Sequence, residues 1–210
     1  MSRRPYTNVA TQQSAEGTDV SFLHGPVEEG KLTARQRQAR HRRMLDLMGV
    51  FARAFPTITF ELLWESSSIN AQAWRLGPAQ YVRVYGGLAR HNAMTRAGLA
   101  LMLAHETGHH LGGQPRDPAM PWLTWQGQAD FWAASVGMPA VWGPRARSMT
   151  FRGAREILAL HQAFASDANC DESDLSPVCR LEIFRAGARG LELPASARDA
   201  YALILRDATA

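Results

Sequence analysis

The chain of 210 residues is 46% hydrophobic and carries a formal net charge of +4 at pH 7. This length and composition predict one globular domain with an ordinary hydrophobic core. The apolar run 99–104 is far shorter than the roughly 20 residues of a membrane-spanning helix, and no apolar segment follows the N-terminus as in a signal peptide. We therefore expect a soluble protein, with neither a membrane span nor a signal peptide in this chain.

The positive charge comes almost entirely from arginine, since Lys31 is the only lysine. The densest arginine cluster lies near the start of the first predicted helix and comprises Arg35, Arg37, Arg40, Arg42 and Arg43. No nucleic-acid-binding motif accompanies this cluster. We therefore interpret it as a solvated helix face and expect no specific nucleic-acid partner.

The N-terminal half of the sequence predicts an irregular arm, one helix and three strands. Residues 1–32 show little periodicity and form the arm. A helix follows over 33–55 and ends before Pro56. Alternation of apolar and polar residues then predicts three strands, at 58–64, 71–76 and 80–85. Turn residues separate these strands, which indicates a small antiparallel meander.

The C-terminal half predicts helices joined by loops rich in proline and glycine. An apolar helix begins after the N-cap residue Thr95 and stops at Gly112. Residues 137–144 predict an irregular connection. Further helical patterns cover residues 124–136, 151–166, 177–188 and 195–206. We expect an α+β fold with a single domain over 33–210, whose core is 57–136 and whose helical C-terminal part is 150–207.

Two cysteines, Cys170 and Cys179, enclose a short polar segment. Their spacing is too wide for a typical pair of zinc ligands, which lie two to four residues apart. It suits a disulfide that closes a surface loop, and free thiols are the alternative. A disulfide would favour an oxidising compartment, periplasmic or secreted.

The apolar helix contains the pentad His105-Glu106-Thr107-Gly108-His109. Residues i and i+4 share one face of a helix, so both imidazoles can bind a single Zn²⁺ at roughly 2.0–2.1 Å. Glu106 lies next to that position and can take the proton from a zinc-bound water. A pattern with three fixed positions also occurs by chance. The apolar segment before the pentad, the glycine that ends the helix and an acidic candidate ligand downstream favour a genuine zinc site.

A catalytic zinc site has a third protein ligand. The helix predicted at 124–136 offers Gln126 and Asp130, which are four residues apart and can face the metal from one side. His161 and Tyr201, in the C-terminal helices, are candidates to donate a hydrogen bond to the transition state.

Over about residues 57–136 the chain resembles the M48-like gluzincin metallopeptidases. The segments that carry the resemblance are Asn70-Ala71-Gln72-Ala73, Gly77, the strand Tyr81–Tyr85, Gly87-Leu88 and the H-E-x-x-H pentad. The resemblance implies a zincin-like fold, with the small sheet packed on the metal-binding helix. It also implies that the glutamate of a later Glu-x-x-x-Asp motif binds zinc, while the aspartate supports a histidine.

This sequence departs from that motif at one position, because Gln126 stands where the family has glutamate and only Asp130 keeps its type. An amide oxygen is a weaker zinc ligand than a carboxylate and leaves positive charge uncompensated at the metal. Three arrangements stay open: Asp130 binds the zinc directly, Gln126 binds it through its carbonyl oxygen, or the site is degenerate.

For a peptide substrate, we expect an extended chain to pair antiparallel with the strand at 80–85. This prediction makes Tyr81, Arg83 and Tyr85 part of the substrate-binding surface. Gly86 and Gly87 follow that strand, and the absence of side chains would let a substrate backbone come close.

Together these patterns predict a zinc-dependent peptidase that hydrolyses peptide bonds of a peptide or protein substrate with a metal-activated water, Glu106 being the general base. Two alternatives stay open. One is a catalytically impaired pseudo-peptidase that acts as a binding or regulatory module. In this alternative, Gln126 indicates the loss of catalysis. The other is a zinc hydrolase of a non-protein amide.

Overall fold

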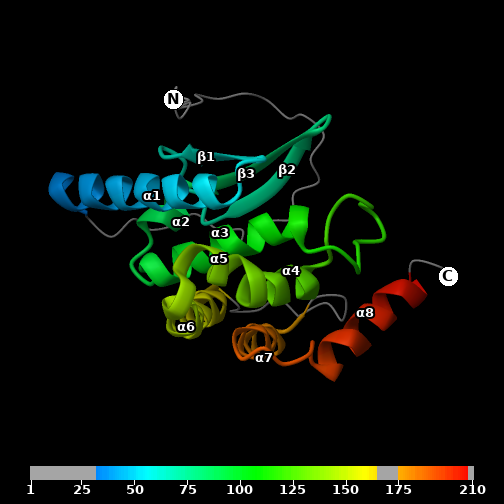
Figure 1. Ribbon diagram of the computed structural model, residues 1–210. Coiled ribbons are helices and arrows are strands. Elements are labelled where there is room, and N and C mark those ends of the chain that lie inside the picture. The colour runs from blue at the N-terminus through cyan, green and yellow to red at the C-terminus, as the bar shows by residue number, and fades with distance from the viewer. Residues whose placement is uncertain (1–31, 165–174, 208–210) are drawn as a thin grey trace. The chain divides into compact units, whose positions relative to one another are not determined.

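The computed structural model describes residues 32–164 and 175–207 (Figure 1). It divides the chain into two compact units, residues 1–92 and 93–210, where the sequence predicts a single domain over 33–210. The predicted α+β class is confirmed, with a small sheet in the first unit and a helical C-terminal half. Within the described ranges, no helix is long and apolar enough to cross a membrane.

The first unit begins with helix α1, Ala34–Ala54, which confirms the helix predicted at 33–55. Its N-terminus is closed by a capping box, in which the Thr33 hydroxyl accepts from the Gln36 N–H and the Gln36 side chain accepts from the Thr33 N–H. One face of α1 is buried and carries Met44, Leu47, Met48 and Phe51. This face anchors α1 in the core of the first unit.

The three predicted strands are present, as β1 (Ile58–Leu63), β2 (Ala71–Leu76) and β3 (Ala79–Tyr85). Their order in the sheet is β1-β3-β2 (Figure 1). β2 and β3 form the predicted antiparallel hairpin, but β1 and β3 are parallel, so an all-antiparallel sheet is wrong. The connection after β1 places β2 two strand positions away from β1. The tight turn between β2 and β3 then places β3 between them, parallel to β1. The sheet is therefore mixed.

The two glycines after β3 open a short helix, α2 (Gly86–Arg90). Three of the five clustered arginines contact other residues of this unit, which corrects their interpretation as a solvated face. Arg43 donates to the Ala89 carbonyl oxygen at 3.4 Å. Arg37 forms an ion pair with Glu65 at 2.6 Å. Arg40 donates to Asn92 Oδ1 at 2.7 Å and to the Arg90 carbonyl oxygen, which tethers α1 to the end of α2.

The second unit is built around helix α3, Arg96–Leu111, which is buried along almost its whole length. The helices that follow are α4 (Gln126–Trp132), a π-helical turn (Ala133–Gly137), α5 (Met138–Trp142), a 3₁₀ turn (Gly143–Arg145), α6 (Ala146–Phe164), α7 (Pro177–Ala188) and α8 (Ala195–Asp207). Both α4 and α6 pack against α3. The unit thus surrounds the pentad helix with other helices.

The irregular connection predicted at 137–144 is wrong, because the chain stays helical there. Pro139 occupies the first turn of α5, where a missing backbone N–H breaks no helical hydrogen bond. Helix α5 ends at its C-cap Gly143, whose φ is +50°, a 3₁₀ turn follows, and α6 starts five residues earlier than the predicted residue 151.

Candidate metal centre

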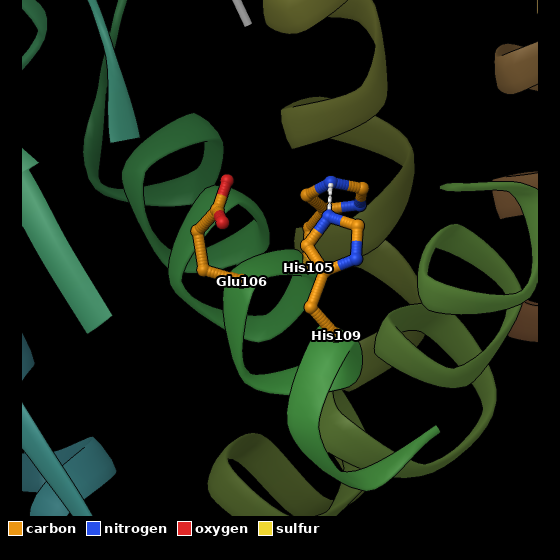
Figure 2. Close-up of side chains that lie close together, drawn as sticks. All are labelled: His105, Glu106 and His109. Carbon is orange, nitrogen blue, oxygen red and sulfur yellow. Dashed lines mark hydrogen bonds between the residues drawn. The ribbon is translucent and has the colours of Figure 1, made fainter. Parts of the chain in front are cut away.

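Helix α3 brings the two histidines of the pentad together, as the spacing predicts. Both side chains are buried, and their Nε2 atoms lie 3.0 Å apart. The ring centroids are 4.5 Å apart with an interplanar angle of 81°. Figure 2 shows the two rings meeting edge to face above α3. The two Nε2 atoms are therefore directed at a common point.

The opposite nitrogen of each ring is held by an acceptor. His109 Nδ1 lies 2.8 Å from the carbonyl oxygen of Thr124, which can only accept, so Nδ1 carries the proton and donates. His105 Nδ1 lies 2.7 Å from Asp130 Oδ1 and donates to this carboxylate. In the neutral rings both Nε2 atoms are consequently unprotonated and present their lone pairs.

With both rings protonated at Nδ1, two lone pairs face each other at 3.0 Å and repel, and a cation bound between them, or a proton on one Nε2, removes that repulsion. Zinc bonds of 2.0–2.1 Å at a tetrahedral angle place two nitrogens roughly 3.3 Å apart, close to the observed separation. Burial lowers the pKa of His105, and burial together with the neighbouring His105 lowers the pKa of His109 well below its usual value. The rings are therefore neutral near pH 7, which is the form that binds a metal.

Asp130, on α4, is fully buried and lies at the Nδ1 side of His105. Arg180, on α7, donates to both of its oxygens, from Nε to Oδ2 at 2.7 Å and from Nη2 to Oδ1 at 2.8 Å. Burial alone would raise the pKa of Asp130, but Arg180 and His105 outweigh it and hold this pKa at about 2. The carboxylate is thus ionised and engaged on both oxygens, away from the Nε2 atoms that converge.

Gly108 allows α4 to approach α3 closely enough for this contact. A Cβ atom at position 108 would lie 2.8 Å from the Ala129 carbonyl oxygen, closer than side-chain atoms pack against backbone. The residue after Ala129 is Asp130, so the close approach brings its carboxylate to His105. The glycine inside the pentad therefore has a packing role.

Gln126 is the first residue of α4 and lies beside the same histidine. Its side chain, like that of Asp130, acts to raise the pKa of His105 against the larger effect of burial. Its Oε1 atom is buried and receives no hydrogen bond of ordinary geometry from any residue that the structure describes. A buried amide oxygen without a donor is costly, and a cation beside His105 would satisfy it.

Glu106 is buried next to the two histidines, on the adjoining side of α3 (Figure 2). One ligand atom from each of His105, Glu106 and His109 lies within 4.8 Å of the other two. The sequence prediction that these three side chains form one cluster is confirmed. The Glu106 carboxylate is thus close enough to both imidazoles to contact one ion, or a water molecule bound to that ion.

The sequence model of peptidase family M48 matches residues 34–159. The chain belongs to peptidase family M48. Its members are metallopeptidases and are generally zinc-dependent. A search of curated proteins and a search of solved structures gave no significant match. The matched residues include α3 and α4, whereas Arg180 of this M48 protein lies beyond them.

The two candidate transition-state donors have different surroundings. Tyr201, on α8, donates to the carbonyl oxygen of Arg116 at 2.8 Å, and its ring lies 5.1 Å from that of Trp125, so it packs in the hydrophobic cluster around Trp125. Burial lowers the pKa of His161 to about 4, with further effects from Arg180, Asp130 and His105. Of the two, only His161 is electrostatically coupled to the metal centre.

The predicted substrate strand is the central strand of its sheet, which contradicts the expected pairing. β3 is hydrogen-bonded to β1 on one edge and to β2 on the other, so neither edge can accept a peptide. Tyr81 stacks on Trp74 with 4.1 Å between ring centroids, and Arg83 forms an ion pair with Glu61 at 2.9 Å. The Tyr85 hydroxyl donates to Gln72 at 3.0 Å. These side chains are engaged within the sheet.

The glycines after β3 are explained by contacts within the chain. A Cβ atom at Gly86 would collide with the Trp64 carbonyl, and one at Gly87 would collide with the Ser67 carbonyl. The close backbone approach that the glycines permit is therefore to the β1–β2 connection of the protein itself.

Cys179, the described partner of the predicted disulfide, has a free thiol in this structure. The thiol donates to the Ser196 hydroxyl at 3.7 Å, and burial raises its pKa. The predicted bond to Cys170 is thus not formed by Cys179 here, and Cys170 itself lies outside the described residues.

Sequence reasoning missed Arg180 and the Thr124 carbonyl. A sequence signal for Arg180 existed: it is three and four residues before Ile183 and Phe184, so it lies on the buried face of α7. An arginine on an apolar stripe indicates a buried acidic partner. A backbone carbonyl such as that of Thr124 leaves no signal, since every residue has one.

Proposed function

We propose that this M48 family member is a zinc-dependent peptidase in which His105, His109 and Gln126 hold the metal and Glu106 is the general base. The observation that carries the proposal is the convergence of the two Nε2 atoms at 3.0 Å, with each Nδ1 beside an acceptor. The side chain of Gln126 lies beside His105, and its buried Oε1 receives no hydrogen bond of ordinary geometry from the described residues, which supports its role as the third ligand. Asp130 then acts as a positioning residue for His105.

Zinc supplies Lewis acidity when bound, polarising a substrate carbonyl and lowering the pKa of water from 15.7 to about 7. Glu106 takes the proton of the attacking water and transfers it to the leaving amine. Asp130 and the Thr124 carbonyl fix the tautomers of His105 and His109, so that both present Nε2 to the metal. Arg180 keeps Asp130 ionised for this task.

The proposed ligand set is electrically neutral, because it consists of two imidazoles and an amide. The charge of Asp130 is balanced by Arg180, so Glu106 is the negative group left to compensate the metal. A less compensated zinc ion is more electrophilic but less tightly held. The same observation favours a second candidate, a catalytically impaired peptidase that binds rather than cleaves its target.

Glu106→Gln tests the mechanism. The amide cannot take a proton from water, so peptide hydrolysis should fall by about 10²–10⁴-fold. Zinc content should stay at the wild-type level, because the proposed ligands are intact. Cleavage of a peptide library, with and without chelator, and metal analysis of the purified full-length chain measure the two quantities. Wild-type turnover in this variant would reject the role of Glu106.

Gln126→Glu separates the two candidate functions. A carboxylate at the third ligand position should tighten zinc binding by tenfold or more, because it adds the missing negative charge. The matched control is Gln128→Glu, which adds the same charge to α4 at a side chain that instead donates to the Gly112 carbonyl. Activity in Gln126→Glu with none in the wild type would support the impaired peptidase. Equal zinc affinity in Gln126→Glu and Gln128→Glu would argue against Gln126 as a ligand.

A further inference from the structure

Residues of α6 and of the C-terminal end of α7 line a hollow of about 390 Å³, namely Phe151, Arg155, Arg185 and Arg189. On each helix the two lining residues are four positions apart and therefore share a face. Arg185 lies five residues beyond Arg180, about 140° around α7. The lining arginines thus belong to a different face from the one that carries Arg180 to Asp130.

Among the described residues, no acidic side chain forms an ion pair with the arginines of this hollow. Arg155, Arg185 and Arg189 are exposed, and none forms an ion pair with a residue in 32–164 or 175–207. The acid next to Arg155 is Glu156, whose carboxylate accepts from Thr95 and Gly98 at the start of α3. Three like charges around one hollow repel each other, and an anion placed among them removes that repulsion.

Phe151 holds one of the lining arginines, Arg189, in place, and it also contacts Arg147 outside the hollow. The guanidinium of Arg189 lies 5.5 Å from the centre of its ring, and that of Arg147 lies at the same distance. Guanidinium groups over an aromatic face gain a cation–π attraction, which restricts two otherwise mobile side chains. One of the three guanidinium groups of the hollow, that of Arg189, is therefore pre-organised before any ligand arrives.

We propose that this hollow binds a phosphorylated small molecule through its phosphate or diphosphate group. Guanidinium groups donate in a planar fork that matches phosphate oxygens, and three of them can surround one dianionic group. The volume lies in the range of small-molecule sites and exceeds that of a single phosphoryl group, so it has room for the remainder of the ligand. This site is separate from the peptidase proposal and does not depend on it.

Calorimetric titration of the full-length protein with inorganic phosphate and pyrophosphate, at constant ionic strength, tests the assignment. Pyrophosphate should bind with one-to-one stoichiometry and more tightly than phosphate, because it carries more charge. The double variant R185Q/R189Q, and separately Arg155→Gln on the other helix, should weaken binding by about 10–100-fold. The matched control is Arg152→Gln, an exposed α6 arginine that does not line the hollow and should leave affinity unchanged.

Circular dichroism establishes that each variant is folded. Equal pyrophosphate affinity in R185Q/R189Q and the wild type would overturn the proposal, as would an equal loss in Arg152→Gln. If pyrophosphate instead bound to a metal at His105 and His109, its binding would be lost with chelator and kept in the arginine variants. That result would also overturn the proposal. A hexaglutamate peptide that binds more tightly than pyrophosphate would replace the phosphate assignment with an acidic-peptide surface.

Discussion

At the scale of single residues, Arg180 shows how a distant side chain sets the chemistry of a histidine. It is a buried cation whose guanidinium contacts both oxygens of the fully buried Asp130. Asp130 in turn accepts from His105 Nδ1 at 2.7 Å. Without the cation, burial would raise the pKa of the carboxyl group and weaken its hold on the imidazole. The orientation of His105 therefore depends on α7.

Replacement of Arg180 by methionine should lower the free energy of unfolding by about 3–5 kcal/mol at pH 7, since it leaves Asp130 buried and unpaired. Urea denaturation measures the change. The double variant Arg180→Met/Asp130→Asn is the control, because it removes both charges and should lose less stability than the single variant. A double variant as unstable as Arg180→Met would contradict the pairing argument.

The same pair predicts a pH dependence of stability. The pKa of Asp130 is about 2 in the folded protein, below its ordinary value of 3.8. The stabilisation is therefore complete above about pH 4 and is lost as the pH falls through 4 towards 2. In Arg180→Met this acid-dependent component should be reduced, which denaturation at a series of pH values would show.

At the scale of elements, α3 depends on α6 for the closure of its N-terminus. The first N–H groups of a helix have no partners within it. Glu156, on α6, accepts from the Thr95 N–H and the Gly98 N–H, both at 2.9 Å, and from the Thr95 hydroxyl at 2.7 Å. The carboxylate also lies at the positive end of the helix dipole. The helix that carries the pentad is thereby fixed to its neighbour.

Glu156→Gln should lower the free energy of unfolding by about 1–2 kcal/mol, because it removes a charged acceptor from three donors at once. Thermal or urea unfolding measures it. Glu182→Gln is the matched control: Glu182 is exposed on α7, and its change should stay within about 0.5 kcal/mol. Equal effects of the two substitutions would show that the cap contributes nothing to stability.

At the scale of the whole molecule, the proposed metal ligands and their supporting residues all belong to the unit of residues 93–210. A ligand that binds only the native state stabilises it by about 2.7 kcal/mol at a free concentration 100 times its Kd. Segments of a protein can unfold locally without global unfolding, and a bound metal opposes local unfolding of the segments that hold it. The stabilisation should therefore be greatest in those elements.

Zinc added to the metal-stripped chain should therefore slow amide hydrogen exchange most in α3 and α4, and least in β1, β2 and β3. Exchange followed by mass spectrometry resolves these segments. In the variant His105→Ala/His109→Ala the response to zinc should be absent. Slowing of equal size in the sheet and in α3, or a response that survives in the double variant, would contradict a metal centre on α3.

The sequence by itself determined most of the elements and the central cluster of this protein, but not the short helices α2 and α5. Apolar periodicity placed α1 and β1, and cap and turn residues placed α3, β2 and β3, all to within one or two residues, because these signals lie within a few neighbouring positions. The four-residue spacing of His105 and His109 placed both rings on one face of α3 for the same local reason.

Only the tertiary structure decided how those elements meet. Strand order depends on which distant segments pair, so the insertion of β3 between β1 and β2, which leaves it no free edge, has no local signature. Asp130 and Arg180 lie 50 residues apart, and the choice of the Nδ1 side of His105 follows from the packing of α4 and α7. Local periodicity depends on neighbouring residues, whereas the partners of a buried charge are determined by long-range packing.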